Sequence, residues 1–146
     1  MTIWVDADAA PRPCKAILFK AAQKRRVDVV LVANGWQTVP GGRVSFVQVP
    51  GGPDVADDYI AERCAQGDLV ITADIPLAAR AVEKGAEVVT PHGRELDADS
   101  VGEALSVRDF NQELRDLGVM TGGPRPYDAK AKQRFANAVD RWIARR

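Results

Sequence analysis

The sequence predicts an α/β fold: a single domain with three layers, α/β/α, around a mainly parallel sheet. Three observations lead to this prediction. The chain has 146 residues, which is the length of one ordinary domain. Short apolar runs alternate along it with stretches of helical periodicity, as they do in β-α-β units. Several of these runs are mainly apolar, as expected for strands that helices cover on both faces.

The first part of the chain is expected to form three strands and one helix. Residues 3–5 form the first strand, which ends in the acidic stretch 6–8. Pro13 opens a helix, because proline is favoured in the first helical turn and the apolar residues after it recur at spacings of three and four. The apolar runs at 27–33 and 44–49 predict the second and third strands.

The alternation continues through the middle of the chain. A second helix is expected to begin at Asp54 and to end at Gly67. A strand is expected over residues 68–72, a helix over 74–84 and a fifth strand over 86–89. Each of the two helices is followed by a glycine, the usual residue at a helix C-terminus.

Beyond Pro91 the sequence predicts helices only. Capping-box patterns place two helix starts at Ser100 and Ser106. A final amphipathic helix carries its large apolar residues on one side: Phe135, Val139, Trp142 and Ile143. We expect residues 1–96 to form the sheet part of the domain and residues 97–146 its helical part.

Composition and charge limit the classes of function that the protein can have. Twenty Lys and Arg balance twenty Asp and Glu, with one His, so the net charge is zero. Strong, non-specific nucleic-acid binding by bulk charge is therefore excluded, although a local basic patch is not.

Cysteine usage and hydropathy predict a cytoplasmic protein. Two cysteines, Cys14 and Cys64, are too few for a disulfide framework or a Cys-only zinc site, and both lie on apolar helical faces that predict core positions. We expect no signal peptide, because no basic segment with a long apolar run follows Met1. No apolar run approaches the about 18 residues that a membrane span needs.

Polar residues follow the predicted strands at the edge where doubly wound sheets bind ligands. Acidic residues at that edge repel one another unless a proton or a hard divalent cation offsets them. Mg²⁺ takes oxygen ligands, and one or two such ions activate water for attack on a phosphodiester. The sequence lacks the Cys/His cluster that zinc prefers. The residues after the strands are Asp6, Asp8, Asp54, Asp57, Thr72, Asp74 and His92.

Structural roles compete with this hypothesis for some of these residues. Asp54 and Asp74 stand where helix N-caps belong, and Asp57 where a capping-box partner belongs. Capping and metal binding are compatible. Thr72 either satisfies backbone groups or supports catalysis. Asp6 and its neighbour Asp8 are harder to explain structurally, because two acids at the end of a buried strand are costly unless they are paired.

Four segments carry a family resemblance that runs almost from end to end. They are Ile3-Trp4-Val5-Asp6-Ala7-Asp8-Ala9, residues 50–60 with Asp-Val-Ala-Asp at their centre, residues 67–78 with Ile-Thr-Ala-Asp-Ile-Pro-Leu-Ala, and Thr121-Gly122-Gly123-Pro124. The chain resembles the YaiI/YqxD family of uncharacterised bacterial proteins. That family is similar to PIN-like nucleases, whose sheet order is 3-2-1-4-5 and whose acidic cluster binds Mg²⁺ or Mn²⁺.

The resemblance implies a metal-dependent nuclease, with RNA as the expected partner. Asp6 matches the first acid of the cluster and Asp74 the acid after the fourth strand. The implied metal ligands are Asp6, Asp54, Asp57 and Asp74, and the implied catalytic residues are Asp6, Asp8 and Asp74 with Thr72 in support. The chain departs from the family at three places: Ala10 where Cys is usual, His92 where Arg is usual, and Ala131 where Asp is commoner. The loss of the Cys argues against thiol chemistry.

Substrate-binding residues are expected outside the acidic cluster. His92 lies next to the expected site, or it is an ordinary surface residue. The last helix is basic, which indicates either a solvated face or, with the glycine-rich loop before it, an edge that binds phosphate. Trp36, in a loop after the second strand, either stacks on a base or packs against the protein. The predicted substrate-binding set is His92, Gly122, Gly123, Arg125 and Lys132.

Two other functions remain open. Val5-Asp6-Ala7-Asp8 also resembles the opening aspartate pair of haloacid-dehalogenase phosphatases, but Asp57-Asp58 precedes the strand that such enzymes place before their paired acids. The third possibility is a non-catalytic module that keeps the acidic pocket as an ion or partner site. Trapping of a covalent aspartyl phosphate would identify the phosphatase. Metal binding without turnover would identify the non-catalytic module.

Overall fold

A six-stranded sheet forms the centre of the computed structural model, which describes residues 1–52, 54–106 and 127–146. Its order is β3-β2-β1-β4-β5-β6, which confirms the predicted order of the first five strands. Those five pair in parallel, and β6 pairs with β5 antiparallel. The strands are β1 (Thr2–Asp6), β2 (Asp28–Ala33), β3 (Val44–Gln48), β4 (Leu69–Ile71), β5 (Glu87–Val89) and β6 (Glu95–Leu96).

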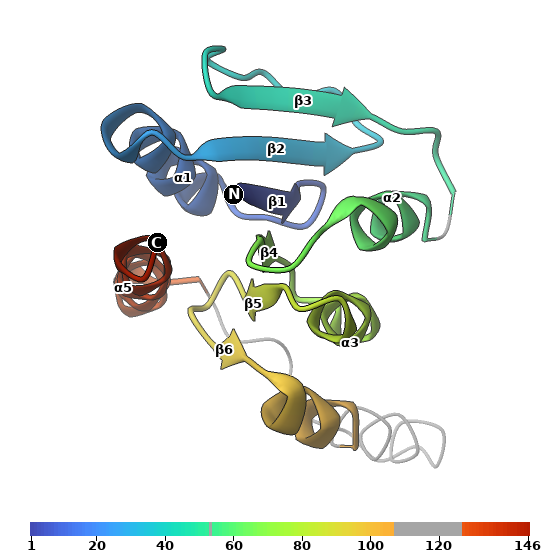
Figure 1. Cartoon of the computed structure of the whole chain (residues 1–146). Helices are drawn as coiled ribbons and strands as arrows, with labels where there is room; N and C mark the ends of the chain where they lie inside the picture. Colours follow the sequence, from blue (N-terminus) through green and yellow to red (C-terminus); the bar gives the residue numbers. More distant parts are fainter. Residues whose placement is uncertain (53, 107–126) are drawn as a thin grey trace.

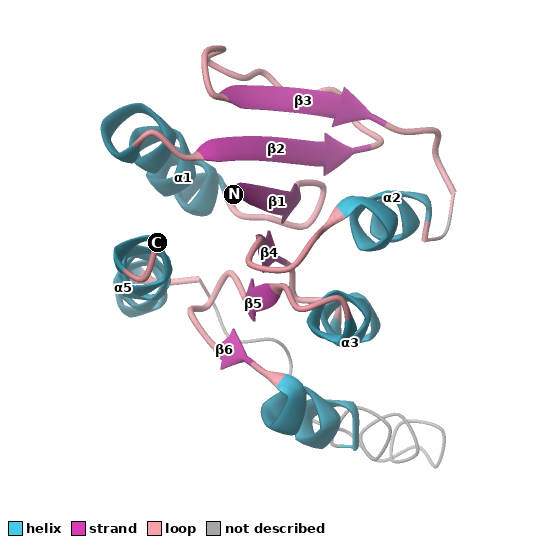
Figure 2. Cartoon of the chain, viewed as in Figure 1, coloured by secondary structure: helices cyan, strands magenta, loops and turns pink. Residues whose placement is uncertain are grey.

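Helices cover both faces of the sheet, so the predicted three-layer α/β/α class is confirmed. Helices α1 (Arg12–Arg25) and α5 (Ala129–Ala144) lie on one side (Figures 1 and 2). Helices α2 (Val55–Arg63) and α3 (Ile75–Glu83) lie on the other side. Residues 98–106 are also helical. Within the described ranges no helix is both long and apolar enough to cross a membrane.

The core consists of two apolar clusters, one on each face of the sheet. Phe135 and Trp142 of α5 are buried against the α1 side, as the apolar spacing of the last helix predicted. Ile60 of α2 and Leu77 of α3 are buried on the other side. Complete burial of side chains of this size stabilises the fold by about 1.5–3 kcal/mol each. Both cysteines are buried, as predicted: Cys14 and Cys64.

The prediction of helices alone beyond Pro91 is wrong, because β6 follows β5 as a short antiparallel strand. The predicted helix start at Ser100 is also wrong. Asp97 caps this helix instead: its Oδ1 accepts the Ser100 N–H at 2.9 Å, and the Ser100 hydroxyl oxygen accepts the Asp97 N–H at 2.8 Å. Ser106 is still helical, and its hydroxyl donates to the Gly102 carbonyl. Its predicted capping partner, Asp109, lies outside the described residues.

The second helix ends earlier than predicted, at Arg63 rather than Gly67. A buried carboxylate explains the early end. Asp68 accepts hydrogen bonds from the Ala65 N–H, the Thr2 N–H and the Trp4 indole N–H at 3.0–3.1 Å. These bonds draw the chain after Cys64 away from the helix axis and join it to the start of β1.

A tight turn packs the chain after β5 against α5. Gly93 has φ +91°, and a Cβ at this position would lie 2.6 Å from the Arg134 carbonyl carbon. Only glycine fits such a close approach of two backbones. The preceding His92 ring lies edge-on to Tyr127, with centroids 5.2 Å apart.

Residues 1 and 146 lie near each other at the amino end of the sheet (Figure 1). Met1 and Arg146 line the same shallow hollow. Ion pairs hold the end of α5 to the sheet: Arg141 with Glu95, and both Arg145 and Arg146 with Glu87.

Candidate functional site

The carboxyl ends of β1 and β4 bring carboxylates together from distant parts of the sequence. Asp6 is the last residue of β1, and Asp74 follows β4 as the N-cap of α3. Asp57 lies in the first turn of α2, and the negative charges of Asp74, Asp6 and Asp54 all act on it. We call Asp6, Asp54, Asp57 and Asp74 the acidic cluster. The structure thus brings Asp6, Asp57 and Asp74 together, and the charge of Asp54 also acts on Asp57.

Among the residues of the acidic cluster, Asp57 has the largest shift in pKa. Its pKa is raised to about 7, most of all by burial and further by the charges of Asp74 and Asp6. A side-chain hydrogen bond with Asp74 acts in the same direction. Asp57 therefore keeps its proton to a much higher pH than a free aspartate does, and protonation is one of the two ways to offset crowded carboxylates.

A buried threonine connects two of the acids. The Thr72 hydroxyl donates to Asp6 Oδ2 at 3.1 Å, and Thr72 Oγ1 accepts the Asp74 N–H at 3.0 Å. Thr72 is only 2% exposed. Burial raises the pKa of Asp6; the hydrogen bond from Thr72 opposes this rise, and the charges of Asp74 and Asp8 reinforce it. Thr72 therefore sets the position of Asp6 relative to the start of α3.

The structure confirms only one of the predicted helix-capping roles of these acids. Asp74 Oδ1 accepts the Leu77 N–H at 2.9 Å, so the predicted cap of α3 is confirmed. The predicted side-chain cap by Asp54 is wrong: it precedes α2 but has φ +63°, outside the extended region of a side-chain cap, and makes no capping hydrogen bond. Asp57 makes no capping-box hydrogen bond to the Asp54 backbone within the described residues, and its carboxyl group interacts with that of Asp74.

Asp8 faces a neighbouring loop. Its Oδ2 accepts the Asn34 N–H at 2.8 Å, and its Oδ1 accepts the Gly35 N–H at 3.3 Å. Both oxygens are thus engaged with the loop after β2. Asp8 is still close enough for its charge to act on Asp6. Asp8 therefore fixes the position of the loop after β2 next to the acidic cluster.

Two of the five predicted substrate-binding residues, His92 and Lys132, lie in the described part of the chain. His92 packs on Tyr127. Lys132 is exposed on α5, which lies across the sheet from α2 and α3. The other three predicted residues, Gly122, Gly123 and Arg125, lie outside the described residues. Much of the basic charge of α5 also has partners, because Arg141 pairs with Glu95 of β6, and Arg145 and Arg146 pair with Glu87 at the start of β5.

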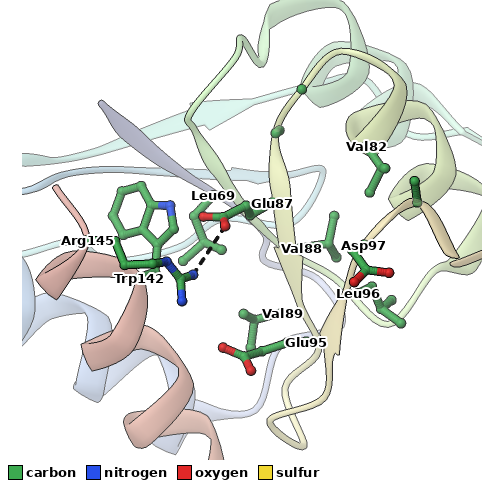
Figure 3. A pocket seen from close by; sticks show the side chains of 13 residues that line it. Leu69, Val82, Glu87, Val88, Val89, Glu95, Leu96, Asp97, Trp142 and Arg145 are labelled. Carbon is green, nitrogen blue, oxygen red and sulfur yellow. Dashed lines mark hydrogen bonds and ion pairs between the residues drawn. The ribbon is translucent and has the colours of Figure 1, made fainter. Parts of the chain in front are cut away.

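Another cavity lies away from the acidic cluster. It has a volume of about 290 Å³ and is lined by the start of β5, by β6 and by the end of α5. Figure 3 shows Arg145 reaching Glu87 beside Trp142 at this cavity. The indole N–H of Trp142 is buried without a hydrogen-bond partner among the described residues. None of the predicted site residues lines this cavity.

Two cations beside the site were missed by sequence reasoning. Arg12 and Lys15, at the start of α1, line a hollow together with Trp36. A signal was present in the sequence: cations are unfavourable at a helix N-terminus, where the helix dipole prefers acids, and α1 has no acid in its first turn. Their positive charges therefore do not stabilise α1 through its dipole.

The donor set of the acidic cluster fits a hard cation in type and in charge. All of its side-chain donors are carboxylate oxygens, the ligands that Mg²⁺ and Mn²⁺ prefer. No Lys or Arg within the described ranges makes an ion pair with Asp6, Asp57 or Asp74. A ready-made cage is not present, since no three His, Cys, Asp or Glu among these residues are arranged to hold a metal. Mg²⁺ needs only one or two carboxylates, because it keeps several waters.

Comparisons with known proteins identify relatives over the whole chain. Residues 4–145 match the family model described as "Uncharacterized BCR, YaiI/YqxD family". A UPF0178 protein of Xanthomonas campestris pv. campestris is 55% identical over 98% of this chain and 90% of its own. UPF0178 proteins of Cellvibrio japonicus and Pseudoalteromonas atlantica are each 52% identical, over 99% and 100% of this chain and 97% and 100% of their own. No solved structure matches. The chain therefore belongs to the uncharacterised YaiI/YqxD family, also named UPF0178, as its sequence motifs indicated.

Proposed function

We propose that this protein is a Mg²⁺- or Mn²⁺-dependent nuclease that cleaves phosphodiester bonds, with RNA as its substrate. The observation that carries the proposal is the gathering of carboxylates at the carboxyl ends of β1 and β4, where Thr72 joins Asp6 to Asp74 by hydrogen bonds and Asp57 lies within range of both charges. Burial, together with the negative charges of Asp74 and Asp6, raises the pKa of Asp57 to about 7 and so favours its protonated form. None of these three carboxylates forms an ion pair in the described part of the chain. A divalent cation is the other physical solution to the same repulsion.

The position of the cluster supports a catalytic role. It lies beyond the carboxyl ends of β1 and β4, where β1 has β2 on one side and β4 on the other. Chain order reverses between these two strands, and ligands of open α/β sheets bind at such points.

Each acidic residue has a role in the proposed site. Asp6 and Asp74 would hold the cation, with Asp57 as a further ligand once it has lost its proton, and Asp54 beside them. The bound cation would supply an activated water and stabilise charge on the phosphoryl group. Thr72 holds Asp6 at the required spacing from Asp74.

The phosphatase alternative has less support. Such an enzyme needs Asp8 free to act as a general acid beside Asp6. In the structure both oxygens of Asp8 accept backbone N–H groups of Asn34 and Gly35. The geometry therefore favours a bracing role for Asp8. The non-catalytic alternative shares the same acidic cluster and is distinguished by turnover alone.

A cleavage assay tests the proposal. Purified wild type is incubated with labelled single-stranded and double-stranded RNA and DNA, with Mn²⁺, with Mg²⁺ or with chelator. We expect cleavage that requires metal and that Asp57→Asn reduces at least tenfold. Asp58→Asn is the matched control, because Asp58 is the next residue but is exposed and pairs with Arg80.

Three outcomes would contradict the proposal. Cleavage that persists in chelator would exclude the metal. Equal loss in Asp57→Asn and Asp58→Asn would assign the effect to α2 rather than to the cluster. Metal binding without cleavage of any substrate in the panel would favour the non-catalytic module.

A further inference from the structure

Trp36 is an exposed aromatic side chain at the same edge of the sheet as the acidic cluster. The residue is 76% exposed and follows β2 directly in a loop. Its ring meets that of Phe46 on β3, with centroids 5.6 Å apart and planes at 87°. Phe46 therefore supports the indole, and most of the indole remains in water. An exposed, supported aromatic ring is typical of a binding surface.

Hollows lie on both sides of Trp36. One, of about 470 Å³, reaches towards α1 and is lined by Arg12, Lys15 and Phe19. The other, of about 460 Å³, reaches along β3 and is lined by Phe46 and Gln48. Trp36, Gln37 and Thr38 line both hollows. Each hollow is in the size range of a small-molecule pocket, so a group can occupy either side of the indole.

The hollow towards α1 is cationic. Lys15 Nζ donates to the Gln37 side-chain oxygen at 2.7 Å, which fixes the ammonium group beside the Trp36 loop. Arg12 is exposed at the first residue of α1. Neither cation forms an ion pair with a carboxylate in the described ranges. Both lie at a helix N-terminus, whose dipole also favours an anion.

Asp8 connects this surface to the acidic cluster. It accepts the N–H groups of Asn34 and Gly35, the two residues before Trp36. Its charge acts on Asp6 on one side and on Lys15 on the other. The Trp36 loop, the start of α1 and the end of β1 are therefore neighbours at one edge of the sheet.

We propose that Trp36, Arg12 and Lys15 form a binding surface for single-stranded nucleic acid, next to the acidic cluster. The inference rests on the proposed function for the reaction that follows binding. An unpaired base stacks on the indole, and phosphates contact the two cations. The cations also offset the repulsion between the acidic cluster and the phosphates. Duplex bases are already stacked and cannot lie on the Trp36 ring, so the surface selects single strands.

Binding in the presence of chelator tests the surface separately from cleavage. The probes are fluorescein-labelled oligouridylate and oligothymidylate, and the measurement is fluorescence anisotropy against protein concentration. We expect Trp36→Ala to raise Kd at least tenfold and Trp36→Phe to raise it less, since phenylalanine keeps a stacking face. Arg12→Ala with Lys15→Ala is expected to weaken binding and to flatten its salt dependence. Lys24→Ala, in the last turn of α1, is the matched control and should change nothing.

The outcomes separate this inference from the proposed function. If Trp36→Ala binds as tightly as wild type, the binding surface is refuted even when the protein cleaves RNA. Suppose that binding is lost in Trp36→Ala and retained in Asp6→Asn, but that neither wild type nor any variant cleaves. The binding surface then stands and the nuclease is refuted. If Trp36→Ala changes only self-association, measured by light scattering, the residue belongs to a protein contact and the inference fails. Urea melts of each variant establish that it is folded.

Discussion

Thr72 and Asp6 are joined by a 3.1 Å hydrogen bond from the threonine hydroxyl to Oδ2 of the carboxylate. The same hydroxyl oxygen accepts the N–H of Asp74. One buried side chain therefore links the end of β1 to the first turn of α3. The spacing between two carboxylates of the acidic cluster depends on a group that is not itself acidic.

Replacement of Thr72 by Val tests this link. Valine keeps the shape but removes the hydroxyl, so Asp74 N–H and Asp6 Oδ2 each lose a partner in a buried region. We expect the free energy of unfolding to fall by about 1–3 kcal/mol. Urea denaturation measures the change. Thr72→Ser keeps the hydroxyl and should lose less; equal losses would show that the methyl group, rather than the hydrogen bond, matters.

The pKa of Asp57 predicts a pH dependence of stability. Because this pKa rises from 3.8 to about 7 on folding, the folded chain binds more protons than the unfolded chain between those values. The stabilising contribution of Asp57 is therefore complete below about pH 4 and is lost as the pH rises through 7. The loss should be about 1–2 kcal/mol once solvent screening of this half-exposed group is allowed for.

Asp57→Asn isolates that contribution, because asparagine does not titrate. Urea melts between pH 4 and pH 8 should show wild type losing stability relative to Asp57→Asn as the pH rises. Asp58→Asn should follow the wild-type curve. Parallel curves for wild type and Asp57→Asn would contradict the raised pKa.

Divalent cations should stabilise the fold in a pH-dependent way. A cation and a proton compete for the same carboxylates, so millimolar Mn²⁺ should raise Tm more at pH 8 than at pH 5.5. Binding at a hundredfold excess over Kd contributes about 2.7 kcal/mol. Thermal scans with metal and with chelator measure the difference. Coincident scans at pH 8 would exclude useful metal binding.

Asp6→Asn should separate activity from stability. The amide oxygen of asparagine can still accept the Thr72 hydroxyl, so the fold is retained. Without the charge of Asp6, repulsion within the acidic cluster falls, and the variant should be at least as stable as wild type in chelator. Its stabilisation by Mn²⁺ and its cleavage activity should be lost. A variant that is less stable in chelator yet fully active would give Asp6 a structural role.

Gly93→Ala should be strongly destabilising. The new Cβ would lie 2.6 Å from the backbone of α5, in a conformation with φ +91° that alanine rarely adopts. We expect a loss of about 3 kcal/mol or more in urea melts. Gly102→Ala is the control, because a Cβ there meets no atom within 4 Å and residues 98–106 are helical. That variant should gain up to about 1 kcal/mol.

The order of the sheet and the acidic cluster could be predicted because both follow from periodicity and topology. Mainly apolar runs such as 27–33 and 44–49 predict strands, and the carboxyl ends of parallel strands meet at one edge. Asp6 and Asp74, which follow their strands closely, therefore had to lie near each other. The same argument could not reveal Thr72 as the link between them, since a threonine at a strand end has several possible partners.

Other features depend on contacts that leave little trace in the sequence. Strand β6 has two residues, Glu95 and Leu96, which is too short for any periodicity. The start of the following helix was placed at Ser100, because Asp97 and Ser100 cap each other and either suits the position. Asp54 has a left-handed backbone conformation that depends on tertiary packing and not on the local sequence. The neighbours of Trp36 on α1 and β3 could be known only from the packing of those elements.

The nearness of Met1 and Arg146 has a practical consequence for handling the protein. Both lie at the amino end of the sheet, and the acidic cluster lies at the carboxyl end. An affinity tag or fluorophore attached at residue 1 or residue 146 would stand on the side of the molecule away from Asp6. Immobilised or labelled forms of the protein should therefore keep the carboxyl edge open to solution.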